Sequence, residues 1–240
     1  MWKILMALAA VCLVAAPAMG DWKTGDPYKM HYPQLPDPTG WDICATQPVV
    51  LADDFRCTET GPITDIHFWG SWKGNVVGQI TNAHLSIHAD IPAGTGGITF
   101  SRPGTQLWYR DIEPSLIGTE PSSAQGWYDP VGNVWTKPDH TLWYQYNIVG
   151  ITNPWIQQVN TIYWLDIQVT TAGGVWGWKT SVSPHFGDDA VWAQSLATPG
   201  WQKLEDQQGN SLDLAFVITP EPATLALVAL GGLALLRRRR

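Results

Sequence analysis

Two acidic doublets come closest to a catalytic arrangement in this sequence. Asp53-Asp54 and Asp188-Asp189 are the doublets, whereas glycoside hydrolysis needs two carboxylates that face one cleft, roughly 5 to 9.5 Å apart. Adjacent residues of a strand point to opposite faces, so a doublet alone does not make such a pair. We therefore predict no catalytic residues. Because Ca²⁺ takes about six to eight oxygen ligands, a structural calcium ion held by these four aspartates in loops is one alternative, and solvated turn carboxylates are the other.

Two histidines resemble a metal pair. His84 and His88 would face one ligand on a helix, but the apolar residues between them alternate as in a strand, where four residues span about 13 Å. They cannot share one zinc ion, and we expect both on the solvent face. The sequence also contains no CxxC, HExxH or GxSxG motif, so redox, zinc-protease and serine-hydrolase chemistry have no support.

Tryptophan dominates the aromatic residues, with 15 Trp against 7 Tyr and 5 Phe. An indole offers a broad apolar face for stacking on a sugar ring as well as for core packing. Alternation along the expected strands puts Trp69, Trp143 and Trp164 on faces shared with polar side chains. We predict these three to be exposed, with Trp143 and Trp164 forming a sugar-binding platform. The side chains expected to hydrogen-bond the sugar hydroxyls are Gln145, Asp166 and Gln168.

Core packing is the alternative for any single tryptophan, because large aromatic side chains are mostly buried. We expect it for Trp176, Trp178 and Trp192, which lie in or next to the segments GWKTS from Gly177 and DDAVW from Asp188. The sugar-binding interpretation therefore depends on the face assignments of the strands.

Short segments of period two must position these side chains. Alternation is clear at 83–89, 142–148, 163–169 and 212–218, and further strands are expected at 63–69, 98–101, 106–111 and 175–180. Gly and Pro clusters separate the segments, and no stretch between the two chain ends has helical periodicity. The pattern predicts an all-β fold, an antiparallel β-sandwich of jelly-roll type.

The N-terminus has the layout of a secretory signal. Lys3 precedes an uncharged apolar run, and small residues surround the exit at Ala18 and Gly20. We predict a signal peptide at 1–20, a proline-rich arm at 21–48, the sandwich at 49–219 and a separate segment at 220–240.

The C-terminal segment is apolar but short. Residues 223–236 would extend about 21 Å as a helix against a hydrocarbon core of roughly 30 Å. Arginines from Arg237 onward would hold the end on the cytoplasmic side. Pro220-Glu221-Pro222, the apolar helix and the arginines closely resemble the PEP-CTERM sorting signal, which implies a Gram-negative bacterium and an exosortase that removes the tail at the inner membrane. The alternative is a transmembrane anchor that is kept.

Export from the cell affects whether the cysteines are oxidised. Cys12 lies in the signal, so the exported domain holds Cys44 and Cys57, 13 positions apart. In an exported protein we predict that they form a disulfide, which would add about 3 kcal/mol by closing a loop of this length.

The net charge argues against nucleic acid as a partner. Of 21 acidic and 14 basic side chains, 20 acidic and 9 basic fall within 21–219. Nucleic-acid binding relies on a surplus of Lys and Arg near phosphates, and this surplus is absent.

The middle of the chain also resembles a family. Its motifs are DPYKMH from Asp26, LADDFRC from Leu51, GPITDIHFWGSW from Gly61, GWKTS from Gly177 and DDAVW from Asp188. Together they are similar to a secreted bacterial domain of unknown function found in surface proteins with a PEP-CTERM tail or a dockerin. The resemblance brings no catalytic residues, and its pattern does not require Cys44.

These features together predict a non-enzymatic cell-surface or matrix protein that binds polysaccharide through exposed tryptophans. The alternative is a structural or adhesive surface protein with protein partners, which it would meet through a sheet edge or an aromatic patch.

Overall fold

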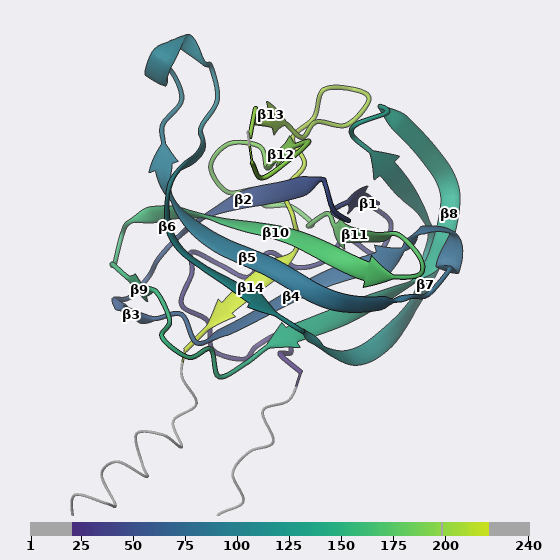
Figure 1. Cartoon of the computed structure of the whole chain (residues 1–240), viewed down its shortest axis with the longest axis horizontal. Helices are drawn as coiled ribbons and strands as arrows, with labels where there is room; N and C mark the ends of the chain where they lie inside the picture. The colour runs from purple at the N-terminus through teal and green to yellow at the C-terminus, as the bar shows by residue number, and fades with distance from the viewer. Residues whose placement is uncertain (1–20, 198, 221–240) are drawn as a thin grey trace, which may run out of the picture. The chain divides into compact units, whose positions relative to one another are not determined.

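Two six-stranded sheets pack face to face in the computed structural model of the chain (Figure 1). The structure describes residues 21–197 and 199–220, so the predicted signal peptide and the sorting residues Glu221, Pro222 and Arg237 lie outside the described residues. Within these two ranges, no helix is long and apolar enough to cross a membrane. The elements are β1 (Trp41–Cys44), β2 (Val50–Arg56), β3 (Gly61–Pro62), β4 (Asp65–Trp72), η1 (Lys73–Asn75), β5 (Gln79–Ile91), η2 (Thr95–Gly97), β6 (Arg102–Ile112), β7 (Ser115–Asp129), β8 (Val134–Ile148), β9 (Ile156–Gln157), β10 (Ile162–Ala172), β11 (Trp176–Lys179), β12 (Val191–Ala193), β13 (Gln202–Lys203) and β14 (Phe216–Thr219).

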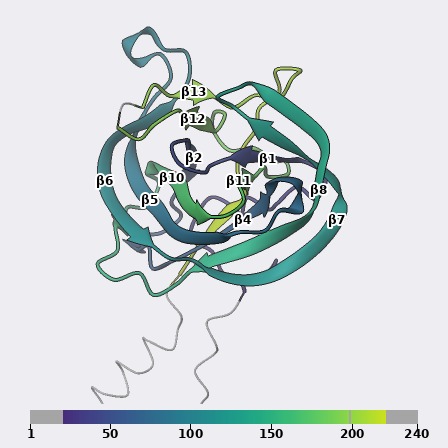
Figure 2. The ribbon, with the colours of Figure 1, turned by 45° about the vertical axis from the view of Figure 1, so that its right-hand side comes forward.

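The first sheet has the strand order β11-β1-β7-β8-β4-β14. Strand β11 pairs with β4 as well as with β1, so that β11, β1, β7, β8 and β4 form a closed ring of pairings (Figure 2). Strands β1 and β7 run parallel, and the other pairs in this sheet are antiparallel. The predicted antiparallel sandwich is therefore confirmed, with one parallel pair inside it.

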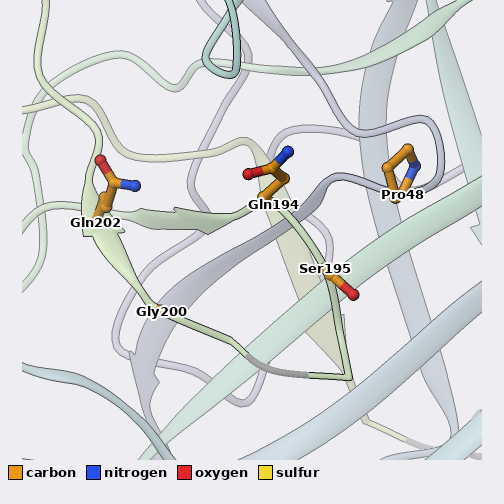
Figure 3. A pocket seen from close by; sticks show the side chains of 5 residues that line it. All are labelled: Pro48, Gln194, Ser195, Gly200 and Gln202. Atoms are coloured by element: carbon orange, nitrogen blue, oxygen red, sulfur yellow. The ribbon is translucent and has the colours of Figure 1, made fainter.

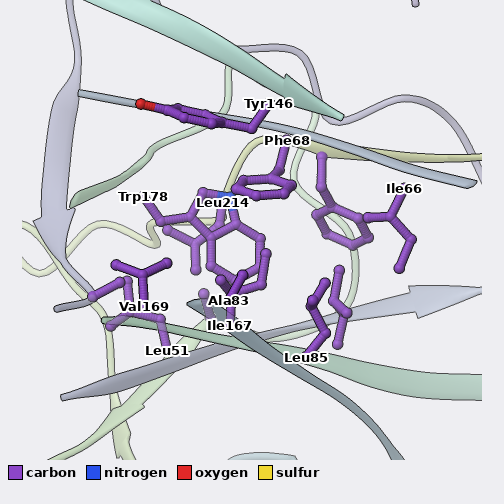
Figure 4. Close-up of a cluster of buried hydrophobic side chains, with 14 of the residues drawn as sticks. Leu51, Ile66, Phe68, Ala83, Leu85, Tyr146, Ile167, Val169, Trp178 and Leu214 are labelled. Atoms are coloured by element: carbon purple, nitrogen blue, oxygen red, sulfur yellow. The ribbon is translucent and has the colours of Figure 1, made fainter. Parts of the chain in front are cut away.

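The second sheet has the order β13-β12-β2-β10-β5-β6 and is antiparallel throughout. Alternate residues of its central strands, such as Leu85 and Ile167, face aromatic side chains of the first sheet, such as Phe68 and Trp178 (Figure 4). Each fully buried side chain of this size stabilises the fold by about 1.5–3 kcal/mol. This apolar layer holds the two sheets together.

The strands predicted from alternation are present at most of the expected positions. Segments 83–89, 142–148 and 163–169 lie within β5, β8 and β10. Segment 98–101 is not a strand, because it forms a bend after η2 that places Phe100 against the second sheet. Strands β2 and β7 were not predicted, since neither VLADDFR nor SLIGTEPSSAQGWYD alternates cleanly between apolar and polar residues.

The proline-rich arm at 21–48 joins the sandwich rather than lying on its surface. Its last residues form β1, which is inserted between β11 and β7. Earlier residues make single bridges, Met30 with Cys57 and Gln34 with Phe216. The arm therefore contacts both sheets, since the Gln34 backbone bridges to β14 while its side chain reaches Asp53 of β2.

Candidate functional site

Trp164 is completely buried, so its predicted exposure is wrong. It does share a face of β10 with Asp166 and Gln168, but a further layer containing Phe100 and Trp201 covers that face. The indole Nε1 donates a hydrogen bond to Asp90 Oδ1 at 2.8 Å. The alternation was assigned correctly, and its polar face is an interior face.

Trp69 and Trp143 lie on the other sheet, on the face of β4 and β8 that is turned away from the main core. Trp69 is buried, with its ring 6.2 Å from that of Trp22 in an edge-on contact. Trp143 is partly buried against the same cluster, and Gln145 Nε2 donates to the Trp22 carbonyl oxygen at 3.2 Å. Because Trp143 and Trp164 belong to different sheets, they cannot form one platform, and that prediction is wrong.

Asp166 forms a buried cluster with Ser86 and His88. Its carboxylate accepts a hydrogen bond from Ser86 Oγ at 2.6 Å and lies 2.8 Å from His88 Nε2. In a Ser-His-Asp triad the carboxylate holds Nδ1 and leaves Nε2 for the serine. Here Nδ1 faces the Gly104 carbonyl oxygen, and His88 Nε2 lies 2.8 Å from Asp166 Oδ2 and 3.0 Å from Ser86 Oγ. The arrangement therefore differs from that of a triad, and because His88 is buried its solvent-face assignment is wrong.

Gln168 is also withdrawn from solvent. Its Nε2 donates to the carbonyl oxygens of Pro48 and Val49 at 2.7 and 3.1 Å. The side chain fixes the loop that leads into β2, and it has no amide hydrogen left for a sugar hydroxyl.

The first acidic doublet lies in β2 and not in a loop. Asp53 is fully buried, and its Oδ2 accepts hydrogen bonds from Gln34 Nε2 at 2.7 Å and from the Leu214 amide at 2.6 Å. Asp54 is also buried, and its Oδ1 has no hydrogen-bond partner among the described residues. Burial, reinforced by the carboxylate of Asp213, raises the pKa of Asp54 to about 9 and also raises that of Asp53. Asp54 therefore stays protonated at neutral pH.

The two carboxylates of the second doublet, Asp188 and Asp189, have different partners. Asp188 Oδ2 accepts a hydrogen bond from the Ser101 amide at 2.7 Å, and Asp189 Oδ2 lies 2.7 Å from Lys203 Nζ. In the two described ranges, no three carboxylate, histidine or cysteine side chains are grouped so that they could hold a metal ion. A structural calcium ion held by these aspartates stays a prediction.

Cys44 and Cys57 are free buried thiols, so the predicted disulfide is wrong. Cys44 lies in β1 of the first sheet, whereas Cys57 bridges to Met30 in the arm. Burial raises the pKa of Cys44 to about 11 and that of Cys57 to about 12. Spacing in sequence alone could not show that the two side chains are held by different parts of the fold.

A polar cleft of about 300 Å³ forms where segments 37–41, 180–185 and 206–212 meet. Ligand sites usually occupy roughly 300–1,000 Å³, so its size is at the lower end of that range. Turn residues and the end of β11 bring these segments together, since the Asp37 amide donates to the Thr180 carbonyl oxygen at 2.9 Å. Acidic, hydroxyl and imidazole residues line it, together with Trp41.

Several groups in this cleft keep unused hydrogen-bonding capacity. Asp37 Oδ1 accepts from the Thr39 amide and hydroxyl at 2.8 and 3.0 Å, which leaves Oδ2 available. Ser181 is only 5% exposed, and its Oγ has no hydrogen-bond partner among the described residues. His185 Nδ1 lies 3.2 Å from Asp213 Oδ2, and its other ring nitrogen has no hydrogen bond to the described residues. The residues that line the cleft thus include donors and acceptors whose hydrogen-bonding capacity the described residues do not fully use.

A second hollow, of about 470 Å³, lies beside β12 and β13. Figure 3 shows Gln194, Ser195 and Gln202 around it, together with Pro48 and Gly200. These described lining residues include no charged group and no aromatic ring, and none of them is a buried polar group without a partner. The cleft at 37–41 is the stronger candidate for a binding site.

Sequence reasoning missed this cleft because residues 37–41 were assigned to the proline-rich arm, and Thr180 and Leu212 to expected strands, with no binding role for any of them. The signal that could have found it is the run DPTGW at 37–41, in which a turn is followed directly by tryptophan. That signal is weak without the knowledge that 180–185 packs beside it.

Two family models match the sequence. One describes a domain of unknown function, DUF7901, and covers residues 30–219. The other describes the PEP-CTERM protein-sorting motif and covers residues 219–240. Neither the curated proteins nor the solved structures contain a match to this chain.

Proposed function

The chain belongs to the DUF7901 family, and we propose that it is a non-enzymatic surface protein that binds a neutral polysaccharide in the cleft formed by 37–41, 180–185 and 206–212. Its PEP-CTERM signal makes it an exported bacterial surface protein and a substrate of exosortase. The proposal adds a Gram-negative envelope, passage through the inner membrane and removal of the C-terminal segment, as the resemblance of the tail implies.

The observation that carries the binding proposal is the unpaired hydroxyl of Ser181 in the wall of the cleft. A buried polar group without a partner costs about 1–3 kcal/mol, and a ligand hydroxyl would relieve that cost. Asp37 Oδ2 accepts hydrogen bonds only, whereas Ser181 Oγ both donates and accepts. Sugar hydroxyls have the matching capacity, because each can donate one bond and accept others.

The charge of the cleft favours a neutral ligand. Asp37 and Asp206 line it, no lysine or arginine does so among its described lining residues, and residues 21–219 carry a large acidic excess. A polymer of uronate or phosphate units would be repelled by these carboxylates. Affinity for a neutral chain should change little with salt, because no ion pairs form across the contact.

The proposal that the protein is non-enzymatic draws on the state of the first acidic doublet. A hydrolase needs one carboxylate that is ionised and another that can donate a proton, both facing the substrate. Asp53 and Asp54 are buried, and the amides around Asp53 already occupy its Oδ2. A purely structural or adhesive role with protein partners is the competing function, and it predicts no saccharide binding at all. Nucleic acid is disfavoured as a partner by the same charge.

Calorimetric titration of the exported protein tests the proposal. The probes are neutral gluco-, galacto- and manno-oligosaccharides, with a uronate oligomer as the anionic comparison. We expect weak binding of at least one neutral probe, at least a tenfold loss in Ser181→Ala and Asp37→Asn, and no change in the matched variant Ser195→Ala of the second hollow. Binding by none of the neutral probes would favour the structural role.

A further inference from the structure

A buried polar cluster occupies the interior of the strand ring. Asp42 of β1, Gln125 of β7, His140 of β8 and Lys179 of β11 are all essentially inaccessible to solvent. Asp42 contacts His140, although β7 lies between their strands, and Lys179 contacts Gln125, although β1 lies between theirs. Contacts between strands that are not neighbours place these side chains inside the ring.

The lysine amine faces both a carboxylate and a side-chain amide. Lys179 Nζ lies 3.2 Å from Asp42 Oδ2 and donates a hydrogen bond to Gln125 Oε1. The Gln125 amide nitrogen points the other way and donates to the hydroxyl of Ser122, which is partly exposed. Asp42 Oδ1 is buried and has no hydrogen-bond partner among the described residues. The amine is thus next to the carbonyl group, and the nitrogen that would leave is directed toward the surface.

We propose that Lys179 and Gln125 become joined by an isopeptide bond after folding, with Asp42 as the residue that carries the protons. The reaction is aminolysis of a primary amide, so it needs neither an oxidant nor a further reactant. Nothing in the binding function depends on it.

The reaction takes place in three steps. Asp42 Oδ2 first takes a proton from the Lys179 ammonium, and the neutral amine attacks the Gln125 carbonyl carbon Cδ to form a carbon–nitrogen bond. Asp42 passes its proton to the amide nitrogen and then removes a second proton from the attacking nitrogen. The bond from Cδ to the original nitrogen breaks, and that nitrogen leaves with both protons as ammonium. One ammonium ion is therefore released for each secondary amide formed.

The surroundings support this use of Asp42. Burial disfavours its charge, but the cations of Lys179 and His140 outweigh that effect and lower its pKa. The carboxylate is consequently ionised at neutral pH, and its position beside the amine rather than its basicity suits it to the role, because a lowered pKa makes it a weaker proton acceptor. His140 Nε2, 2.9 Å from Asp42 Oδ2, holds the carboxylate in place. Fixed neighbours of this kind raise the effective concentration of the amine by many orders of magnitude, and the dry interior limits competing hydrolysis.

The bond would have a mechanical consequence for an exported protein. It would link β7 to β11 across β1, so the ring could not open on either side of β1. Buried ion pairs add little net stability, because the desolvation of both charges offsets their attraction. A covalent bond at the same place would instead restrict the unfolded chain, as a disulfide does.

Peptide mapping of the full chain tests the proposal. A protease that cleaves at aspartate separates Gln125 from Lys179, because Asp129, Asp139 and Asp166 lie between them. We expect the two resulting peptides to remain joined, with a combined mass lower by one ammonia. Finding both peptides separate and at full mass in the folded protein would overturn the proposal, and would leave a buried ion pair without affecting the saccharide-binding function.

Variants test the roles of Lys179 and Asp42 in the cross-link, and peptide mapping reads the result without a binding or activity assay. Lys179→Arg keeps the positive charge but has no nucleophilic amine at neutral pH, so the peptides should separate. Asp42→Asn keeps the shape of the side chain and should prevent the bond, with circular dichroism to check that the protein folds. Lys203, whose Nζ contacts the carboxylates of Asp189 and Glu205, is the matched control, and Lys203→Arg should leave the cross-link intact. A cross-link that persists in Asp42→Asn would show that Asp42 is not the proton carrier.

Discussion

The Trp164 indole donates to the Asp90 carboxylate at 2.8 Å inside a covered layer of the second sheet. Trp164 sits on the polar face of β10, but Phe100 and Trp201 close that face from outside. A polar partner within reach lets a large aromatic residue with an N–H group be buried without an unsatisfied donor. The contact explains why a tryptophan surrounded by polar residues in sequence is part of the core.

Truncating this side chain should reduce stability and leave binding unchanged. We expect Trp164→Ala to lower the free energy of unfolding by about 3–5 kcal/mol, because it creates a large cavity and removes the hydrogen bond to Asp90. Tyr109→Ala is the control, since Tyr109 is 50% exposed and its loss should cost less than about 1 kcal/mol. Urea denaturation measures both. A Trp164→Ala protein as stable as the wild type would mean that the indole is not in the core.

Protonation of Asp54 should make the protein more stable at acidic pH. Its pKa is near 3.8 when unfolded and about 9 when folded, so between these values the native state binds the extra proton. This contribution to stability is complete below about pH 4 and falls as the pH rises toward 9.

Asp54→Asn removes that dependence, because the amide is neutral at every pH. We expect the variant to be more stable than the wild type at pH 8, by about 1–3 kcal/mol, and close to it at pH 4. Urea denaturation at the two pH values measures the difference. A wild-type stability that rises between pH 5 and pH 8 by an amount that disappears in Asp54→Asn would contradict the raised pKa.

Thiol titration should find Cys44 and Cys57 reduced and protected. In the folded protein neither should react at pH 8, because burial raises both pKa values and blocks access. After denaturation without reductant, both should react. If the denatured protein had no reactive thiol, the two cysteines would instead form a disulfide.

Processing at the two ends is testable by mass measurement. Protein recovered outside the cell should lack residues 1–20 and the segment beyond the Pro220-Glu221-Pro222 motif, because exosortase recognises the matched signal. Deletion of the motif is the control and should keep the protein from being released. An exported protein that still ends at Arg240 would argue for a retained anchor.

The sequence predicted the sandwich well because period-two alternation follows directly from strand geometry, as β5, β8 and β10 show. It failed for the faces of Trp69 and Trp164 because alternation separates two faces without telling which one a third layer will cover. The disulfide prediction for Cys44 and Cys57 failed for a related reason. Spacing along the chain does not fix the distance in space when strands far apart in sequence pair with each other. The cleft is built by three segments far apart in sequence, so only the fold could bring Asp37, Ser181 and Asp206 together.

Saccharide binding in that cleft is the central claim, and amide hydrogen exchange tests it most directly. Exchange of the exported protein is compared with and without the neutral oligosaccharide that binds best in titration. We predict slower amide exchange at 37–41 and 180–185, because binding orders the cleft. Exchange at 163–168 around Trp164 should not change, because the covered sheet is unaffected. Protection confined to 194–202 beside the second hollow, or no protection at any segment at saturating ligand, would contradict the account.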